Sequence, residues 1–394
     1  MHGSSNGLTK TAGPYLMKGS DGSSVCLNCH QLAGAPGPQG VLVSTADPDM
    51  PPGTPPRQLG PAGDFGWLKK SYSWIPPGGT TPLVSPGERH GHNVVALDYG
   101  YLPDGLHPVA PAGSYPSASL QCSSCHDPHG AYRRVVGGTV VRTGLPITGS
   151  GSLADGMGPT PTTGVGSYRM LAGAGYQPRS IGGNVAFVNA PPVALAPVDF
   201  NRSETVAQTR VAYGSGMSEW CTNCHTGIAV NGETQSHSGL GHPVGPTATL
   251  DSGVVANYVA YVGTNQITNT DPSRAYWSLV PFEEGVTDAT LLVDHARSDD
   301  GYLAGPSTRS SVSCLTCHRA HASGFDGMTR FRADRTSITV GDPLGASAWP
   351  EPALNPGEAQ GRTAAETQQA YYGRPATLYP AFQQRLCNKC HPSD

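Results

Sequence analysis

The hydrophobic residues of this chain form short runs with helical or alternating spacing, and long polar stretches separate the runs. Alternation typical of a β-strand appears at 134–142, and we expect one or two hairpins. Short helices are predicted at 203–212, where Ser203 can act as the N-cap, and at 254–262, 289–296, 364–372 and 380–390. The pattern therefore predicts a fold that is mostly coil, with short α-helices and few strands.

Four stretches rich in Pro, Gly, Thr and Ser interrupt these elements, at 33–61, 76–86, 143–165 and 337–361. Loops of this length are uncommon inside a compact domain. With 52 glycines, 37 prolines and only 13% charged residues, the chain offers little apolar surface to offset its conformational entropy. A large apolar group tied to the chain at several points would supply the missing core, because binding that needs the folded site also stabilises the fold.

Every cysteine lies in one of five copies of Cys-x-x-Cys-His, the attachment signature of c-type haem. In this motif the two thiols bond to the haem vinyl groups and the adjoining histidine binds the iron from one face. The motifs are broadly evenly spaced, which favours a linear array of at least five haem c groups. The predicted attachment residues are Cys26, Cys29, Cys122, Cys125, Cys221, Cys224, Cys314, Cys317, Cys387 and Cys390, and the proximal iron ligands are His30, His126, His225, His318 and His391.

Two other interpretations of the cysteines are weaker. Paired Cys-x-x-Cys can form zinc sites or redox disulfides. A zinc site does not need a histidine after the second cysteine in every copy, and five two-residue disulfide loops would stabilise little.

The charge pattern excludes some partners. Lys plus Arg number 24 against 28 acidic residues, without basic runs, so we expect no nucleic-acid partner. No apolar stretch reaches membrane-spanning length. Thioether attachment of haem takes place outside the cytoplasm, so we expect export through the periplasm. Because no signal peptide precedes Leu8, we expect a mature or trimmed form.

Fourteen histidines are present, nine more than the motifs use, which suggests a histidine on both faces of each iron. A methionine ligand would raise the potential, but the seven methionines show no comparable relation to the motifs. Two imidazoles leave no open position for a substrate, so this ligand set is suited to electron transfer at low potential. The histidines outside the motifs are His2, His90, His92, His107, His129, His237, His242, His295 and His321.

Two motifs extend to Cys-x-x-Cys-His-x-x-His, pairing His126 with His129 and His318 with His321. The second histidine is too close in sequence to reach the opposite face of the same haem, so we expect it to bind a different haem. Capping of a turn, or a contact to a propionate, is the alternative. His2 in Met1-His2-Gly3 has the same local setting and could bind an iron beyond its own chain; a disordered terminal histidine is the alternative.

At this point the sequence resembles the OmcS-type outer-surface multihaem cytochromes of metal-reducing bacteria, which polymerise into extracellular filaments. The resemblance runs over nearly the whole chain and is most specific around the motifs. The matching segments are Gly63-Asp64-Phe65-Gly66-Trp67, 122–134, 210–224, Pro281-Phe282-Glu283-Glu284-Gly285, 314–331 and 371–391.

The resemblance implies bis-histidine haems and a continuous haem chain through a head-to-tail polymer. It also implies that the histidine at the place of His2 ligates the His318 haem of an adjacent subunit. His90, His107 and His237 match no ligand and are expected at the surface or on propionates. The implied distal ligands are His2, His92, His129, His242, His295 and His321.

The family has six motifs, and the chain begins just after the place of the first. We therefore expect a single multihaem domain over 1–394 that either lacks an upstream haem-binding segment or carries five haems with one spare ligand.

The expected function is long-range electron transfer through a filament to extracellular acceptors such as ferric oxides, electrodes or other cells. A head-to-tail interface that does not close into a ring gives an open helical polymer. A monomeric periplasmic or outer-surface shuttle is the alternative. A pentahaem reductase is disfavoured because such enzymes need one open iron position, commonly marked by an irregular motif, whereas all five motifs are regular.

Overall fold

The computed structural model describes residues 18–34, 42–127, 171–182, 185–195, 211–228, 242–260, 280–296 and 304–391, and the backbone of three short strands between 134 and 165. Loops connect short elements throughout. The α-helices are α1 (Gly22–His30), α2 (Cys122–Cys125), α3 (Met217–Cys221), α4 (Ser252–Ala260), α5 (Cys314–Cys317), α6 (Pro356–Ala359) and α7 (Ala364–Ala370).

The strands are two or three residues long and pair antiparallel. Three sheets are simple pairs, β1-β2, β6-β7 and β8-β9, and the fourth has the order β4-β3-β5. These lengths confirm the predicted coil-dominated fold. The strands are β1 (Tyr72–Trp74), β2 (Leu83–Ser85), β3 (Arg134–Val136), β4 (Thr139–Val141), β5 (Thr163–Val165), β6 (Ala194–Leu195), β7 (Ala212–Tyr213), β8 (Val340–Gly341) and β9 (Ser347–Ala348).

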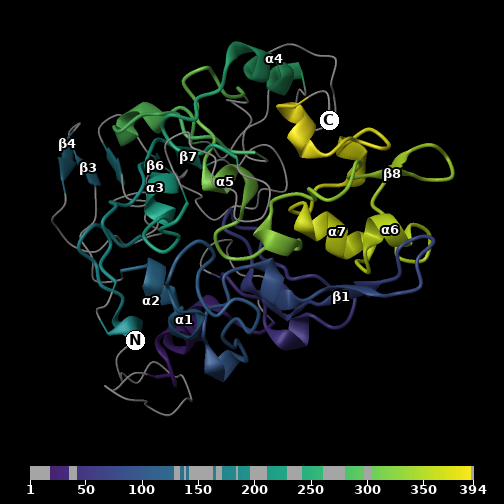
Figure 1. Cartoon of the computed structure of the whole chain (residues 1–394), viewed down its shortest axis with the longest axis horizontal. Coiled ribbons are helices and arrows are strands. Elements are labelled where there is room, and N and C mark those ends of the chain that lie inside the picture. The colour runs from purple at the N-terminus through teal and green to yellow at the C-terminus, as the bar shows by residue number, and fades with distance from the viewer. Residues whose placement is uncertain are drawn as a thin grey trace.

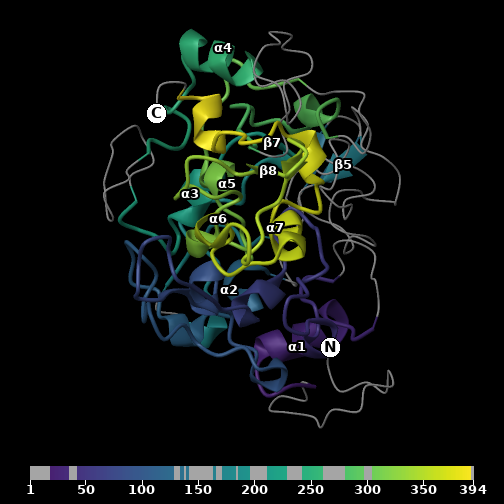
Figure 2. The ribbon, with the colours of Figure 1, turned by 90° about the vertical axis from the view of Figure 1, so that its right-hand side faces the viewer.

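The elements that carry the cysteine motifs follow one another through the molecule. In both ribbon views α1 lies near the bottom with α2 above it, α3 and α5 lie in the middle, and α4 lies at the top near the C-terminus (Figures 1 and 2). Contacts join α1 to α2, α3 to α5, and α4 to the 3₁₀ turn Leu386–Lys389 of the last motif. The motifs are therefore arranged along the molecule in sequence order.

The predicted elements are partly correct. The helices α4 and α7 overlap the predicted helices at 254–262 and 364–372, and the strand predicted at 134–142 is two short strands, β3 and β4, paired as a hairpin. The predicted helix at 289–296 is a 3₁₀ turn over Ala289–Leu292, and the one at 380–390 is limited to Leu386–Lys389. The prediction at 203–212 lies outside the described residues except for its end, where Ala212 is in strand β7 and pairs with Leu195 instead of continuing a helix.

Buried arginines hold the loops together in the core. Arg319, Arg330, Arg362 and Arg374 are each 2% exposed or less. The guanidinium of Arg319 donates to the Pro61 carbonyl at 2.9 Å, and that of Arg362 donates to the Gly324 carbonyl at 2.7 Å. Loops leave carbonyl groups without ladder partners, and a buried carbonyl without a hydrogen bond is costly.

Aromatic rings complete this core. The Trp349 and Tyr371 rings stack with centroids 4.8 Å apart, and Tyr379 meets both at steep angles. The Arg319 guanidinium lies 3.3 Å from the ring centroid of Tyr372, a cation–π contact. Packing of flat rings and guanidinium groups thus replaces the helix and sheet packing of an ordinary core.

At Gly63 the backbone passes very close to the backbone of Ala322. The φ angle of Gly63 is +94°, and a Cβ there would lie 1.7 Å from the Ala322 carbonyl oxygen. We predict that Gly63→Ala lowers the free energy of unfolding by at least about 2 kcal/mol, because it adds both strain and a clash. Gly60→Ala, in open space, is the matched control. Chemical denaturation measures the difference, and equal midpoints for the two variants would contradict the prediction.

Candidate haem attachment and iron-ligand sites

Each cysteine motif lies on or beside a helical turn. Residues three and four apart on such a turn share one side, so both thiols and the histidine of a motif face the same way. In four motifs the histidine amide donates to the carbonyl of the first cysteine: His126 to Cys122 at 2.9 Å, His225 to Cys221 at 3.1 Å, His318 to Cys314 at 3.0 Å and His391 to Cys387 at 3.0 Å. In the fifth, the motif forms the end of α1.

Two of the motif helices begin with the same capping box. The Gln121 amide donates to Ser124 Oγ at 2.9 Å before α2, and the Ser313 amide donates to Thr316 Oγ1 at 2.9 Å before α5. The hydroxyl residue between the two cysteines therefore starts the helical turn that brings the cysteines to one side.

A serine three residues before one motif contacts the next motif, and this arrangement occurs twice. Ser23 Oγ accepts a hydrogen bond from the Cys122 amide at 3.0 Å, and Ser218 Oγ accepts one from the Cys314 amide at 3.3 Å. Both serines are fully buried. The chain thus builds two equivalent motif pairs, the first from α1 and α2 and the second from α3 and α5.

Within each pair the two first thiols touch. A hydrogen bond with Cys122 raises the pKa of Cys26, and one with Cys314 raises the pKa of Cys221, with burial adding to both. Groups attached at these sulfurs would therefore lie close together within a pair.

Two of the other cysteines, Cys125 and Cys317, lie near cysteines of the motif that follows. Burial raises the pKa of Cys125, with nearby Cys224 adding to the rise. Burial likewise raises the pKa of Cys317 to about 12, with Cys387 and Cys390 adding. The five motifs thus form one continuous row.

Three pairs of histidine rings face each other across the row. With a metal–nitrogen bond of about 2 Å on each side and two ring half-widths, the centroids of two axial imidazoles should lie about 6 Å apart. The observed separations match this distance. They are 6.1 Å for His92 and His225, 6.3 Å for His126 and His321, and 6.1 Å for His242 and His391.

Three of these paired histidines, and also the motif histidine His318, have Nδ1 on a backbone carbonyl. A carbonyl only accepts, so Nδ1 carries the proton and Nε2 keeps its lone pair for a metal. The acceptors are Pro111 for His225 at 2.8 Å, Gly327 for His318 at 2.7 Å, Ala320 for His92 at 2.7 Å and Pro243 for His242 at 2.9 Å. These residues fit a porphyrin iron.

Desolvation favours the neutral ring that a metal requires. It lowers the pKa of His92 to about 4, with nearby His225 contributing, and it lowers the pKa of His318. Nδ1 of His295 faces the Glu284 carboxylate, which also leaves Nε2 for a metal.

Of the three histidines for which no ligand role was predicted, the structure describes His90 and His107. His107 is 51% exposed beside Asp104, in agreement with a surface position. His90 is fully buried, and both its ring nitrogens have protein partners, Trp67 O at 3.0 Å and Ser85 Oγ at 2.8 Å. Its expected place at the surface or on a propionate is therefore wrong. His2, His129 and His237 lie outside the described residues.

Glu283 is a site residue that sequence reasoning missed. Its Oε1 accepts hydrogen bonds from the Met217 and Ser218 amides at 2.9 and 3.2 Å, at the start of α3. Burial raises its pKa to about 7, with Glu219 adding to the rise. In the sequence Glu283 appeared only within a stretch of family resemblance, and nothing there showed that it is buried against α3.

Comparison with known proteins agrees with this geometry. No protein-family model matches the chain. The c-type cytochrome OmcS of Geobacter sulfurreducens is 50% identical over 385 residues, which cover 98% of this chain and 87% of the relative. A cryo-EM structure of the OmcS nanowires from the same organism superposes with a TM-score of 0.87, and a structure of the outer membrane cytochrome S filament superposes with a TM-score of 0.86. In each case the sequences are 48% identical, and the match covers 97% of the chain in the solved structure.

The motif turns and facing imidazoles define a multihaem c-type cytochrome, which holds haem c through its cysteine thiols. The similarity to OmcS covers nearly the full chain and narrows this class to one family. The protein belongs to the OmcS family of multihaem cytochromes. In the described part of the chain no helix is both long and apolar enough to cross a bilayer.

Glu283 gives the fold a dependence on pH. Its pKa in the folded protein lies above the ordinary value of 4.5, so the folded state holds more protons than the unfolded chain between about pH 4.5 and 7. As the pH rises from about 4.5 to about 7, the free energy of unfolding should therefore fall by up to about 3 kcal/mol. We predict that Glu283→Gln removes most of this fall.

Denaturant midpoints at about pH 5 and pH 8 measure the effect. Glu88→Gln, at an exposed glutamate, should leave the fall unchanged. If Glu283→Gln loses as much stability between these two pH values as the unaltered protein does, other groups cause the pH dependence and the prediction is wrong.

Proposed function

We propose that this chain carries five haem c groups, each bound by two motif cysteines and ligated by two histidines. The three imidazole pairs at ligand spacing are the observation that carries the proposal, and in His92, His225 and His242 a backbone carbonyl holds Nδ1. The motif histidines supply the proximal ligands. His92 supplies the distal ligand for the His225 haem, His321 for the His126 haem and His242 for the His391 haem.

The other two haems need ligands from elsewhere. His2 of an adjacent subunit serves the His318 haem, as the family resemblance implies. His129 and His295 remain as candidates for the His30 haem, and with five haems one of the two is spare.

The function that follows is electron transfer and not catalysis at iron. A bis-histidine iron has no open position for a substrate. The touching first thiols within each motif pair and the thiol neighbours between pairs support a row of closely spaced haems that spans the molecule. The bound haems supply the redox chemistry, and the protein fixes their order, spacing and ligands.

Self-assembly extends this row beyond one molecule. The nanowire structures of the OmcS relative support a head-to-tail filament for this chain as well. A ligand donated across the interface would make polymerisation and iron ligation interdependent. The polymer acts outside the cell, after export through the periplasm, and its acceptors are ferric oxides, electrodes or other cells.

Removing a distal ligand should open one iron. We predict that His92→Ala leaves haem attachment intact but lets the reduced protein bind about one carbon monoxide per chain, because the His225 iron loses its sixth ligand. His107→Ala is the matched control, since His107 is an exposed histidine beside Asp104. Carbon monoxide difference spectra make the measurement, and a His92→Ala protein that binds none would refute this ligand assignment.

The second test addresses assembly. We predict that His2→Ala weakens or abolishes filament formation and leaves one haem per subunit without a ligand. Negative-stain microscopy and the low-spin spectrum report the two effects. Unchanged filaments with a fully low-spin spectrum would count against donation of a ligand between subunits.

A further inference from the structure

Two proposed distal ligands lie beside one isolated β-bridge between two extended segments, which we call the ladder. Gly91 pairs with Ala322 in an antiparallel bridge. The His92 amide donates to the His321 carbonyl at 3.0 Å, and the Ser323 amide donates to the His90 carbonyl at 2.9 Å. His92 and His321, proposed here for two different haems, are therefore fixed to each other through the backbone.

The two strands of this ladder are as close as their backbones allow. A Cβ on Gly91 would lie 2.3 Å from the His321 carbonyl oxygen and 2.6 Å from the Ala322 Cβ. The His92 ring adds a further bond, from Nδ1 to the Ala320 carbonyl. A shift of one strand must therefore move the other, and both ligand rings with it.

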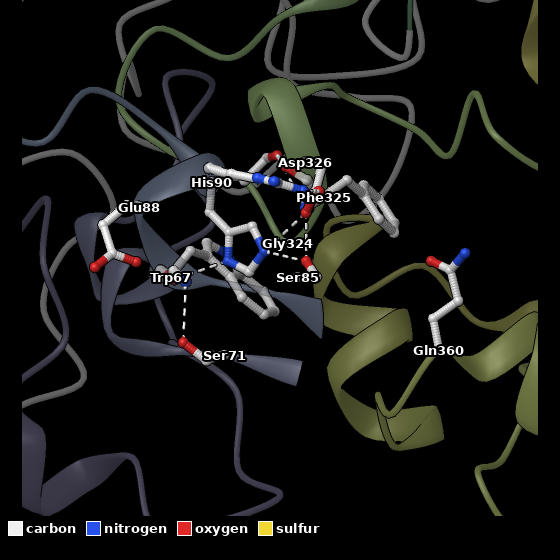
Figure 3. A network of polar contacts seen from close by, with 12 residues as sticks. Trp67, Ser71, Ser85, Glu88, His90, Gly324, Phe325, Asp326 and Gln360 are labelled. Atoms are coloured by element: carbon white, nitrogen blue, oxygen red, sulfur yellow. Dashed lines mark hydrogen bonds and ion pairs between the residues drawn. The ribbon is translucent and has the colours of Figure 1, made fainter. Parts of the chain in front are cut away.

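His90 anchors one end of this ladder in a buried polar network (Figure 3). Its Nδ1 meets the Trp67 carbonyl and its Nε2 meets Ser85 Oγ. Ser85 Oγ also contacts an Asp326 carboxylate oxygen and accepts from Arg362 Nη2 at 3.1 Å. The ring thus joins the turn Phe65–Lys69, strand β2 and the turn Asp326–Met328.

The turn at Asp326 brings a third ligand into the same unit. Gly327, the next residue, provides the carbonyl that accepts from His318 Nδ1 at 2.7 Å. Burial would raise the pKa of Asp326, but hydrogen bonds from His90 and Ser85 outweigh it and hold the pKa at about 2. The carboxylate therefore stays charged near neutral pH and binds its partners firmly.

We infer that His90 is a positioning residue that sets the geometry of three iron ligands, His92 and His321 through the ladder and His318 through the Asp326 turn. It does not bind iron, since both its ring nitrogens have protein partners. The inference rests on the proposed ligand assignments. It gives a role to a histidine for which the family resemblance offered none.

The experiment uses the full haem-loaded protein with His90→Phe, which fills the space without the two hydrogen bonds. Mass spectrometry should show the full number of attached haems. The reduced variant should bind carbon monoxide to about one-tenth of a haem equivalent per chain or more, and the ferric low-spin resonance signals should shift. The unaltered protein, assembled as a filament so that the His318 haem has its ligand from the adjacent subunit, should bind none.

Three further variants make the result decisive. His90→Asn keeps an N–H for the Trp67 carbonyl and should restore part of the low-spin signal. Ser85→Ala removes the bridge to Asp326 with a smaller volume change, and should show the same change as His90→Phe even if the latter does not fold. His107→Phe, at the exposed His107, should bind no carbon monoxide.

The outcomes separate two failures. If His92→Ala opens an iron but neither His90→Phe nor Ser85→Ala changes ligand binding or spin state, the network only stabilises the fold and the inference is overturned. If His92→Ala opens no iron, or the unaltered protein binds carbon monoxide, the ligand assignments themselves fail.

Discussion

Two imidazole rings held about 6 Å apart, centroid to centroid, as two axial ligands of one iron atom would be, are the constraint on which the rest of this structure depends. Each ring must reach its place from a different part of the chain, and its Nδ1 must be occupied so that Nε2 is left for the metal. The carbonyls of Pro111, Gly327 and Ala320 perform this task from loops. The segments between the helices and strands therefore contribute directly to the site, because they bring acceptors to these rings.

Such a fold needs an unusual core. Backbone carbonyls along loops are satisfied by buried arginines, as with Arg319 and Arg362, and flat rings stack on the guanidinium groups. The attached haems supply the large apolar surfaces that the sequence lacks, so folding and cofactor attachment stabilise each other. The repeated serine contacts of Ser23 and Ser218 show that the chain uses one solution twice to pair successive motifs.

The sequence predicted the parts of this arrangement that depend on local pattern. The five motifs, the coil-dominated fold and α7, with its Thr363–Glu366 capping box, follow from short-range spacing. The ring pairs and the burial of His90 and Glu283 did not follow, because they depend on contacts between residues far apart in the chain. His90 and His92 are two residues apart and of the same type, and only the family resemblance separated them in the sequence, by giving His92 a ligand role and His90 none. The three-dimensional surroundings show what His90 does instead, because both its ring nitrogens have protein partners. The 3₁₀ turns were missed because tertiary contacts end them after one turn.

The central claim is that the three ring pairs hold iron. A cryo-EM map of the haem-loaded protein, at a resolution that separates iron from the porphyrin, tests it directly. The account predicts iron density joined to both Nε2 atoms between His92 and His225, between His126 and His321, and between His242 and His391. Iron with a different sixth ligand at any of these positions, or porphyrin density outside the row of motifs, would contradict it.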